Sequence, residues 1–393
     1  MKDELVFAPS THIPPHLIDE IVPKLAYIDE AVVSAKIIPQ GDQVTMRVKA
    51  GTSSSQLTEI ERKTQQVISK VVENDFKPRI KVLEDHLDRE SPYQLDPMAE
   101  LLSSGELRQE QSGVYAFGPL LAGLIDFFES QFIELADHFQ AHPYRFPTLI
   151  PAQDLERVNY FRAFPHSLSF ATHLRSDLDV IDDFSQHACT DDHGLNVSMD
   201  SFAQINTLLS PAVCYHLYFM LADQPLPDGA LCATAVSNCF RYESSNLQSL
   251  ERLWNFTMRE VIFVGSKDYV LDNREEGRKF MEEKFSQIGL AYKVETANDP
   301  FFIGEFKQAI FQSAFQLKYE IRARLPFKSS TLAVGSYNYH QDFFGRHLNI
   351  SLPDGSPAQT GCLAFGLERI AYAFLSQYGL ARDNWPPFVR SAV

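Results

Sequence analysis

The side chains best suited to chemistry lie between residues 239 and 265, in the segment CFRYESSNLQSLERLWNFTMREVIFVG. Arg241 and Glu243 are two residues apart, so their side chains would share one face of an extended strand. Arg259 and Glu260 interrupt a second apolar run. These charges either form the solvated face of an antiparallel hairpin or face a polar cavity. An unpaired ion inside an apolar run is costly, which favours the cavity or mutual pairing.

Two cysteines and a glutamate form a second candidate group. Cys214 stands in LLSPAVCYHLY, Glu260 in the apolar run above, and Cys362 farther along the chain. Two thiolates and a carboxylate are a suitable set of three protein ligands for Zn²⁺, with the fourth position open. Spacing alone leaves another interpretation open, because a free buried cysteine usually acts as a small apolar side chain.

The stretch TGCLAFGLERIAYAFL, residues 360–375, is apolar at alternating positions and then at helical spacing. This pattern predicts a strand that runs into a buried helix. Gly361 and Gly366 are expected where the backbone approaches a neighbour closely.

The order Arg-x-Glu, long loop and Phe-Thr-Met-Arg-Glu on a hairpin resembles motif 2 of the class II aminoacyl-tRNA synthetases, and Gly-Leu-Glu-Arg at 366–369 resembles motif 3. The resemblance implies that Arg241 binds the α-phosphate of ATP and Arg369 the γ-phosphate, both as catalytic groups. Glu243 would accept from the adenine amino group and Phe256 would stack on the base. The ATP-binding residues implied in this way are Arg241, Glu243, Arg252, Phe256, Arg259, Glu368 and Arg369.

Further stretches resemble one branch of this class, the amino acid:carrier protein ligases and the atypical seryl-tRNA synthetases. They include SPAVCYHLY, CFRYE, FTMRE, LKYE, YNYHQDFFG and TGCLAFGLER, in this order. In that branch cysteine, glutamate and cysteine at the places of Cys214, Glu260 and Cys362 hold zinc, whose open position takes the substrate's α-amino group. The other three cysteines have no such match and are interpreted as structural: Cys189, Cys232 and Cys239. The resemblance also suggests residues for an amino-acid pocket, although a surface charge or a cap is about as expected for each: Asp299, Lys318, Glu320, Asn338 and Asp342.

The resemblance implies adenylation followed by transfer. An amino acid, ATP and Mg²⁺ would give an aminoacyl-adenylate, and the phosphopantetheine thiol of a carrier protein would then take the aminoacyl group. We expect a small substrate: glycine, alanine or serine. The strand at 329–336 lacks the acidic residue that commonly holds magnesium in this class, and Ser336 or Asn338 is a possible substitute. Two alternatives stay open: a divergent seryl-type synthetase that charges tRNA, and a non-catalytic paralogue.

Composition limits the class of protein. The chain has 393 residues, 45% of them hydrophobic, and a formal net charge of −16. So acidic a surface disfavours tRNA, and no heptad pattern predicts a tRNA-gripping arm. No apolar run approaches the roughly 20 residues of a membrane span, so no membrane partner is expected. Five scattered cysteines fit a reduced cytoplasmic protein better than a disulfide scaffold.

The elements that would position these residues predict an α+β fold in three parts. Residues 1–75 read as a small α+β unit of unknown role, with strands at 31–38 and 43–49 and a helix from 56 to 73. Residues 76–110 read as a linker with one short helix near Leu101. Residues 111–393 would form the class II catalytic domain, an antiparallel sheet flanked by helices, with an apolar helix at 120–138. Within it, FPTLIP at 146–151 resembles motif 1, which implies a homodimer.

Overall fold

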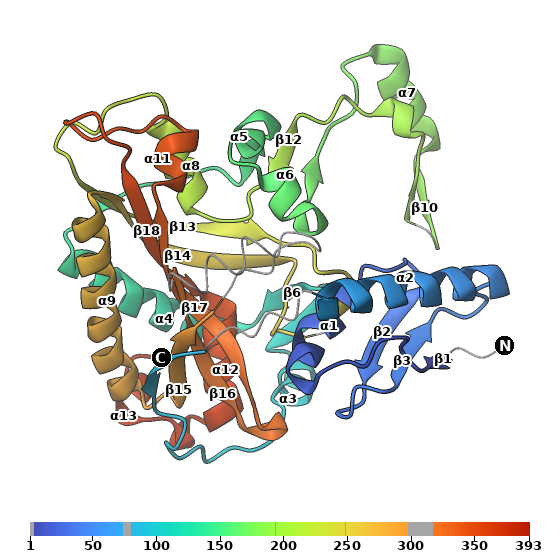
Figure 1. Ribbon diagram of the computed structural model, residues 1–393, viewed down its shortest axis with the longest axis horizontal. Coiled ribbons are helices and arrows are strands. Elements are labelled where there is room, and N and C mark those ends of the chain that lie inside the picture. The colour runs from blue at the N-terminus through green and yellow to red at the C-terminus, as the bar shows by residue number, and fades with distance from the viewer. Residues whose placement is uncertain (1–3, 74–79, 193, 248, 298–316) are drawn as a thin grey trace.

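The computed structural model describes residues 4–73, 80–192, 194–247, 249–297 and 317–393 (Figure 1). Its main element is an eight-stranded sheet in which all neighbours are antiparallel except β13 and β7. In spatial order the strands are β4 (Val82–Asp85), β15 (Tyr292–Thr296), β16 (Lys318–Leu325), β17 (Ser330–Gln341), β18 (Gln359–Gly366), β14 (Asn255–Gly265), β13 (Leu231–Phe240) and β7 (His142–Pro143). The predicted α+β class is therefore confirmed.

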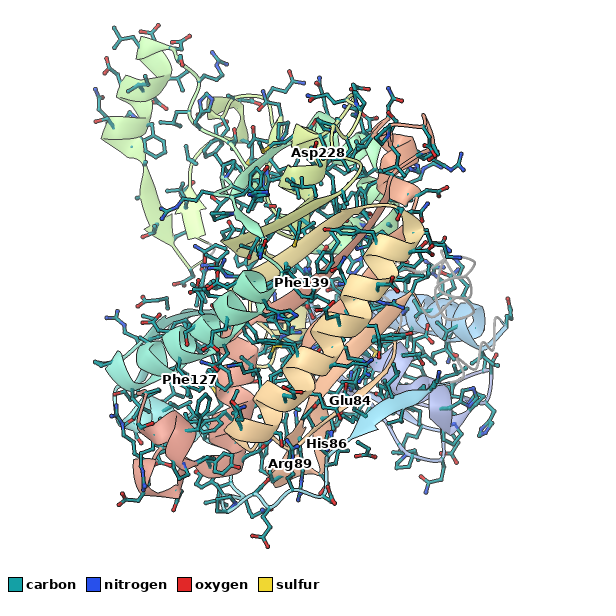
Figure 2. The ribbon with its side chains drawn as sticks, turned by 90° about the vertical axis from the view of Figure 1, so that its left-hand side faces the viewer. Glu84, His86, Arg89, Phe127, Phe139 and Asp228 are labelled. Carbon is teal, nitrogen blue, oxygen red and sulfur yellow. The ribbon has the colours of Figure 1, made fainter. Side chains whose placement is uncertain are left out.

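The two faces of this sheet carry different side chains because residues alternate along each strand. On β14, Val261 and Phe263 join a core with the long helices α4 (Pro119–His138), α9 (Lys267–Ile288) and α12 (Leu367–Tyr378). Figure 2 shows α4 and α9 side by side over this face. Ile262 and Val264 point the other way, into a second core with α8 (Cys214–Met220). The predicted helix at 120–138 and the strand running into a helix at 360–375 are confirmed.

The N-terminal unit has its own core. Strands β1 (Glu4–Phe7), β3 (Val44–Val48) and β2 (Val32–Ile37) form an antiparallel sheet in that order. Helices α1 (Ile18–Leu25) and α2 (Ser54–Glu73) pack on it through residues such as Ile21, Ile60 and Ile68, which are fully buried. The expected elements are present, because each has a clear apolar period that needs no distant partner.

Residues 80–110, predicted as a linker with one short helix near Leu101, contain that helix but also form strands. Strand β4 pairs with β15 at the edge of the large sheet, and it is followed by α3 (Met98–Ser103) and a hairpin of β5 (Leu107–Gln111) and β6 (Val114–Phe117). Glu84 on β4 is buried against Arg278 and the hydroxyl of Tyr292. A four-residue strand held by partners some 200 residues away carries no local periodicity, so the linker prediction was wrong for β4. The division into domains itself stays a prediction.

Residues 149–209 lie beside the second core and extend outward (Figure 1). A three-stranded sheet of β8 (Leu149–Pro151), β12 (Thr207–Leu209) and β9 (Phe170–Ala171) forms its base. Between these strands stand α5 (Ala152–Arg157), α6 (Tyr160–Ala163), α7 (Leu178–His187) and the hairpin β10 (Cys189–Asp191) and β11 (Gly194–Asn196). Two further short helices in the described ranges are α11 (Phe343–His347) and α13 (Pro387–Arg390). None of the helices in the described ranges is long and apolar enough to cross a bilayer.

Candidate active site

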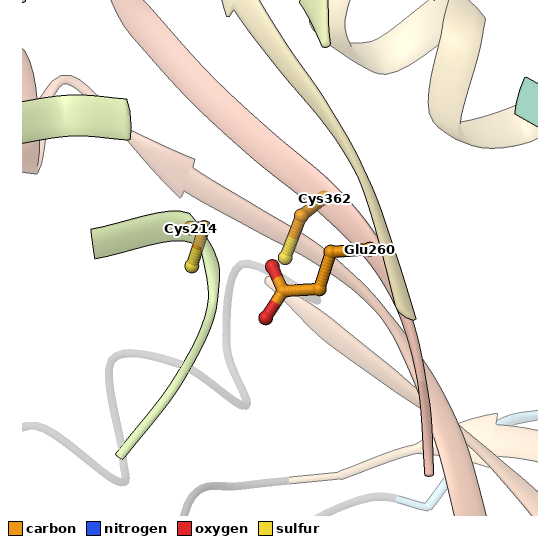
Figure 3. A group of neighbouring side chains, drawn as sticks. All are labelled: Cys214, Glu260 and Cys362. Carbon is orange, nitrogen blue, oxygen red and sulfur yellow. The ribbon is translucent and has the colours of Figure 1, made fainter. Parts of the chain in front are cut away.

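Cys214, Glu260 and Cys362 converge from three elements on the face of the sheet that α8 covers (Figure 3). Cys214 is the first residue of α8, Glu260 lies in the middle of β14, and Cys362 lies on the neighbouring strand β18. One ligand atom from each lies within 4.8 Å of the other two, and all three residues are buried. Only the long-range pairing of β14 with β18 brings residues about a hundred positions apart to one point.

The chemistry of this group fits a metal ion. Oε1 of Glu260 accepts a hydrogen bond of 3.2 Å from the backbone N–H of Val213, which orients the carboxylate. Oε2 is buried and has no hydrogen-bond partner among the described residues, so a ligand position is left open. Burial raises the pKa of Glu260, and a hydrogen bond with Cys362 together with burial raises the pKa of the Cys214 thiol. Two thiols and a carboxyl group in one buried site can all be ionised only if a cation balances their negative charges.

Two further side chains adjoin this group, and neither of them was predicted from the sequence to have a role beside the two cysteines and the glutamate. The amide of Asn338 donates to Sγ of Cys362 at 3.4 Å and to Oγ of Ser336 at 2.9 Å. Tyr218 is fully buried and lies four residues after Cys214, on the same side of α8, with its hydroxyl 3.4 Å from Nδ1 of His340. The helical spacing of Cys214 and Tyr218 was a signal in the sequence that could have identified the tyrosine.

Strand register places most of the proposed pocket residues on this same face. Glu320, Ser336, Ala364 and Glu260 form one row across four strands, because neighbours in register point to the same side. Lys318, Asn338 and Cys362 form the next row.

The residues proposed for the amino-acid pocket form different ion pairs. Glu320 lies 3.3 Å from Lys318 and 2.8 Å from Arg322. Burial alone would raise the pKa of Glu320, but these two cations outweigh burial and lower it. Asp342 instead precedes α11 and pairs with the exposed Arg346 at 2.7 Å, which argues against a place in the pocket. Asp299 lies outside the described residues.

A second cluster of charges stands where β13 leaves the sheet. Glu243 pairs with Arg252, and one of its oxygens lies 3.9 Å from a guanidinium nitrogen of Arg369. The guanidinium of Arg241 lies over the ring of Phe256, 5.4 Å from its centroid, and its Nε donates to the carbonyl of Pro211. Burial alone would raise the pKa of Glu243, but Arg252 and Arg369 outweigh burial and hold it below its usual range. Three cations around one carboxylate make a site that suits a triphosphate.

The position of Arg241 and Glu243 differs from the sequence prediction. Strand β13 ends at Phe240, so both residues lie on the loop that follows rather than on an extended strand. The backbone N–H of Arg241 bonds Trp254, but the N–H of Tyr242 bonds Ser167 instead of the hairpin partner. Because Tyr242 pairs outside the hairpin, the strand ladder does not extend to Glu243.

Two residues predicted to bind ATP instead pair with other groups of the protein. Arg259 lies on the opposite face of the sheet from Glu260, where it pairs with Glu129 of α4 at 2.6 Å. Both carboxylate oxygens of Glu368 accept from the backbone N–H of Thr257, at 2.8 and 2.9 Å. Neither is free to bind a nucleotide, so the structure argues against both assignments.

Gly361 and Gly366 were both predicted to lie where the backbone approaches a neighbour closely, but only one of them does. A Cβ at Gly361 would lie 2.6 Å from Val270 and 2.7 Å from the carbonyl of Asn338, as expected for a close approach. At Gly366 the nearest heavy atom would be 3.7 Å away, which is ordinary contact. The prediction for Gly366 was wrong.

Comparison with known proteins assigns the fold and the family. Residues 204–378 match the family model of the tRNA synthetase class II core domain (G, H, P, S and T). The chain is 32% identical over 306 residues to amino acid–[acyl-carrier-protein] ligase 1 of Bradyrhizobium diazoefficiens, covering 76% of this chain and 90% of the relative. Ligase 2 of that organism is 34% identical over 249 residues, covering 63% of this chain and 72% of the relative.

More distant likenesses agree. The type-2 serine–tRNA ligase of Methanococcus aeolicus is 24% identical over 327 residues, covering 80% of this chain and 62% of that protein. The fold matches the crystal structure of M. kandleri SerRS in complex with A. aeolicus tRNASec with a TM-score of 0.71 and 18% identity, covering 99% of this chain and 77% of that one. With a class II core that carries the Cys/Glu/Cys group, and a 32% identical relative matched over nine-tenths of its length, the chain belongs to the amino acid–[acyl-carrier-protein] ligase family.

Proposed function

We propose that this protein uses ATP to activate a small amino acid as its adenylate and transfers the aminoacyl group to the phosphopantetheine thiol of a carrier protein. The observation that carries the proposal is the buried Cys214, Glu260 and Cys362 group on the sheet face that also presents Lys318 and Glu320. The names of the two Bradyrhizobium relatives support the amino acid and the carrier protein as substrates.

The metal we propose for the Cys/Glu/Cys group is Zn²⁺, for which thiolate and carboxylate donors are suitable. Bound there, it would offer an open coordination position to a neutral amine. Asn338 would hold Cys362 in place through its amide N–H. A metal ion that binds the α-amino group does not itself recognise the substrate's side chain. This supports a small amino acid as the substrate: glycine, alanine or serine.

The cluster at the end of β13 would bind the nucleotide. Arg241 and Arg369 offset the negative charge that develops on the phosphates as the amino-acid carboxylate displaces pyrophosphate, and Phe256 offers a ring face to the base. Glu243 would exchange part of its contact with Arg252 for the adenine amino group. Mg²⁺ would accompany ATP, and Ser336 and Asn338 on β17 would supply neutral oxygen ligands for it.

The deciding experiment is amino-acid-dependent exchange between ATP and pyrophosphate across all common amino acids. The best substrate is then offered to a holo carrier protein and, in parallel, to total tRNA. We expect exchange with a small amino acid, a thioester on the carrier and uncharged tRNA. Exchange supported only by large or acidic amino acids would contradict the substrate proposal, and no exchange with any amino acid would contradict the activity.

The metal is tested separately by Cys214→Ser. This variant should lose bound zinc and amino-acid binding while it keeps ATP binding, because Cys214 belongs to α8 and not to the loop that carries Glu243. Unchanged activity in a protein without zinc would overturn the metal assignment.

Charging of tRNA is the second candidate, because the type-2 serine–tRNA ligases are 23 to 25% identical to this chain. A net charge of −16 opposes it, since a polyanion is repelled by so acidic a molecule. Charged tRNA in the experiment above would favour this candidate over the ligase.

A further inference from the structure

The N-terminal unit touches the candidate nucleotide site directly. Asn246 Nδ2 donates to the carbonyl of Pro23 at 3.2 Å, and Ser244 Oγ donates to the carbonyl of Ala26 at 2.9 Å. The hydroxyl of Tyr27 donates to the carbonyl of Tyr242 at 3.4 Å. Residues 23–27 thus meet residues 242–246, more than 200 positions away, at the loop between β13 and β14.

These contacts use groups that a helix end leaves unpaired. Helix α1 ends at Leu25, and the last carbonyls of a helix have no partner within it. Asn246 satisfies the carbonyl of Pro23, and Ser244 that of Ala26 just beyond the helix. The loop therefore caps the helix, and in return the helix end restrains the loop.

The restrained loop is the one that carries the nucleotide-site charges. Ser244 follows Glu243 directly and has a backbone φ of +52°, in the left-handed region that a residue with a Cβ rarely adopts. Such a conformation persists only where the surrounding structure stabilises it. The hydrogen bond from the Ser244 hydroxyl to the carbonyl of Ala26 is one such stabilising contact. Glu243 in turn engages Arg252 and Arg369.

Tyr27 adds a second connection to the catalytic part. Its ring packs edge-on against His166, with centroids 5.0 Å apart. The next residue, Ser167, accepts the backbone N–H of Tyr242 through its carbonyl. Tyr27 therefore contacts both segments that fix the course of the loop just before Glu243.

We propose that residues 23–27 of the N-terminal unit are a positioning element of the nucleotide site, with Tyr27 and the carbonyls of Pro23 and Ala26 holding the loop that presents Glu243 and Arg252 to ATP. The inference rests on the proposed function in that it takes this loop to bind ATP. It assigns the N-terminal unit a role in the adenylation step, separate from any carrier or tRNA contact.

The test compares full-length Tyr27→Phe and the double variant Ser244→Ala/Asn246→Ala with the wild type in pyrophosphate exchange. Losing two hydrogen bonds should raise the KM for ATP by at least about fivefold in the double variant, and Tyr27→Phe should raise it less. The KM for the amino acid and the zinc content should stay at wild-type values, because the Cys/Glu/Cys group lies on other elements.

Two variants of the N-terminal unit serve as controls. Thr58→Ala removes an exposed hydroxyl on α2 that bonds only within its helix, and Ile60→Val loosens the buried core of the unit without touching the loop. Both should leave the KM for ATP unchanged. The proposal is overturned if the double variant keeps its KM for ATP within twofold of the wild type, or if Ile60→Val raises that KM equally. A wild-type protein without any exchange would instead refute the proposed function.

Discussion

At the scale of single residues, Asn338 is the neighbour that holds the proposed metal group in place. Its amide places one N–H on Sγ of Cys362 and another on Oγ of Ser336, so the side chain is held on both sides. Donors to a ligand atom stabilise its charged form and fix its direction. Such outer partners typically change metal affinity by about 10–100-fold when removed.

We therefore expect Asn338→Ala to lower zinc affinity by about tenfold or more. The measurement is competition for zinc against a chelator of known affinity. Asn338→Asp should be worse, because it replaces a donor by a negative charge beside the thiolate. Ser336→Ala is the matched control, since it removes only the hydroxyl that accepts from Asn338. Equal zinc affinity in Asn338→Ala and the wild type would contradict a role at the metal.

Glu368 predicts a pH dependence of stability. Burial raises its pKa from 4.5 to about 7, so the folded protein binds a proton that the unfolded chain has already lost at intermediate pH. The contribution of this group is therefore greatest below pH 4.5 and is lost as the pH rises to about 7. The loss amounts to about 3 kcal/mol in the free energy of unfolding.

The check is urea unfolding of the wild type and Glu368→Gln between pH 4.5 and pH 8. Glutamine keeps an acceptor for the N–H of Thr257 but does not titrate. The wild type should lose stability relative to the variant across this range, while other titrating groups cancel in the difference. A difference that stays constant with pH would show that the pKa of Glu368 is not raised.

At the scale of elements, the sequence predicted those helices and strands whose apolar residues follow a clear period within the element itself. The hairpin strands, the helix at 120–138 and the strand running into a helix at 360–375 each carry a clear pattern within one window. Strand β4 could not be found in this way, because a short edge strand depends on a distant partner. The Cys/Glu/Cys group was proposed through family resemblance, since its three members never come close in the sequence.

Arg259 and Glu260 illustrate the limit within one strand. Adjacent residues on a strand point to opposite faces, so both could not face the same site. The face of the sheet on which the proposed metal group lies depends on which helix covers that face, α8 or α4. This is a long-range contact that the local sequence pattern does not encode. In the structure Glu260 faces the side of α8, and Arg259 faces α4.

This placement predicts that Arg259 stabilises the fold and does not bind ATP. Arg259→Ala would leave Glu129 as an unpaired, partly buried charge and should lower the free energy of unfolding by about 2 kcal/mol. Arg259→Leu/Glu129→Leu removes both charges and should recover most of that loss. The KM for ATP should be unchanged in both variants, as measured by pyrophosphate exchange, and a large rise in it would return Arg259 to the nucleotide site.

At the scale of the whole molecule, we predict that the sheet at the base of the extension at 149–209 contacts a second copy of the chain. Leu149 on β8 is 48% exposed and lies in the segment expected to close a dimer. Phe170 on β9 is also exposed, but it is in register with Leu208 and Ile150 and therefore points to the other face of this sheet. An apolar side chain as large as leucine gains roughly 1.5–3 kcal/mol when it is buried, so the exposure of Leu149 favours association on its face.

We predict that the protein sediments at twice its chain mass of 44.6 kDa at micromolar concentration. Leu149→Asp should weaken the dimer by at least about tenfold, because a charge would have to be desolvated in an apolar contact. Leu102→Asp on α3 is the matched control, since Leu102 is 45% exposed but lies on another part of the molecule, and it should leave the dimer intact. A wild-type monomer would refute the dimer, whereas a dimer that survives Leu149→Asp would place its contact on a different surface.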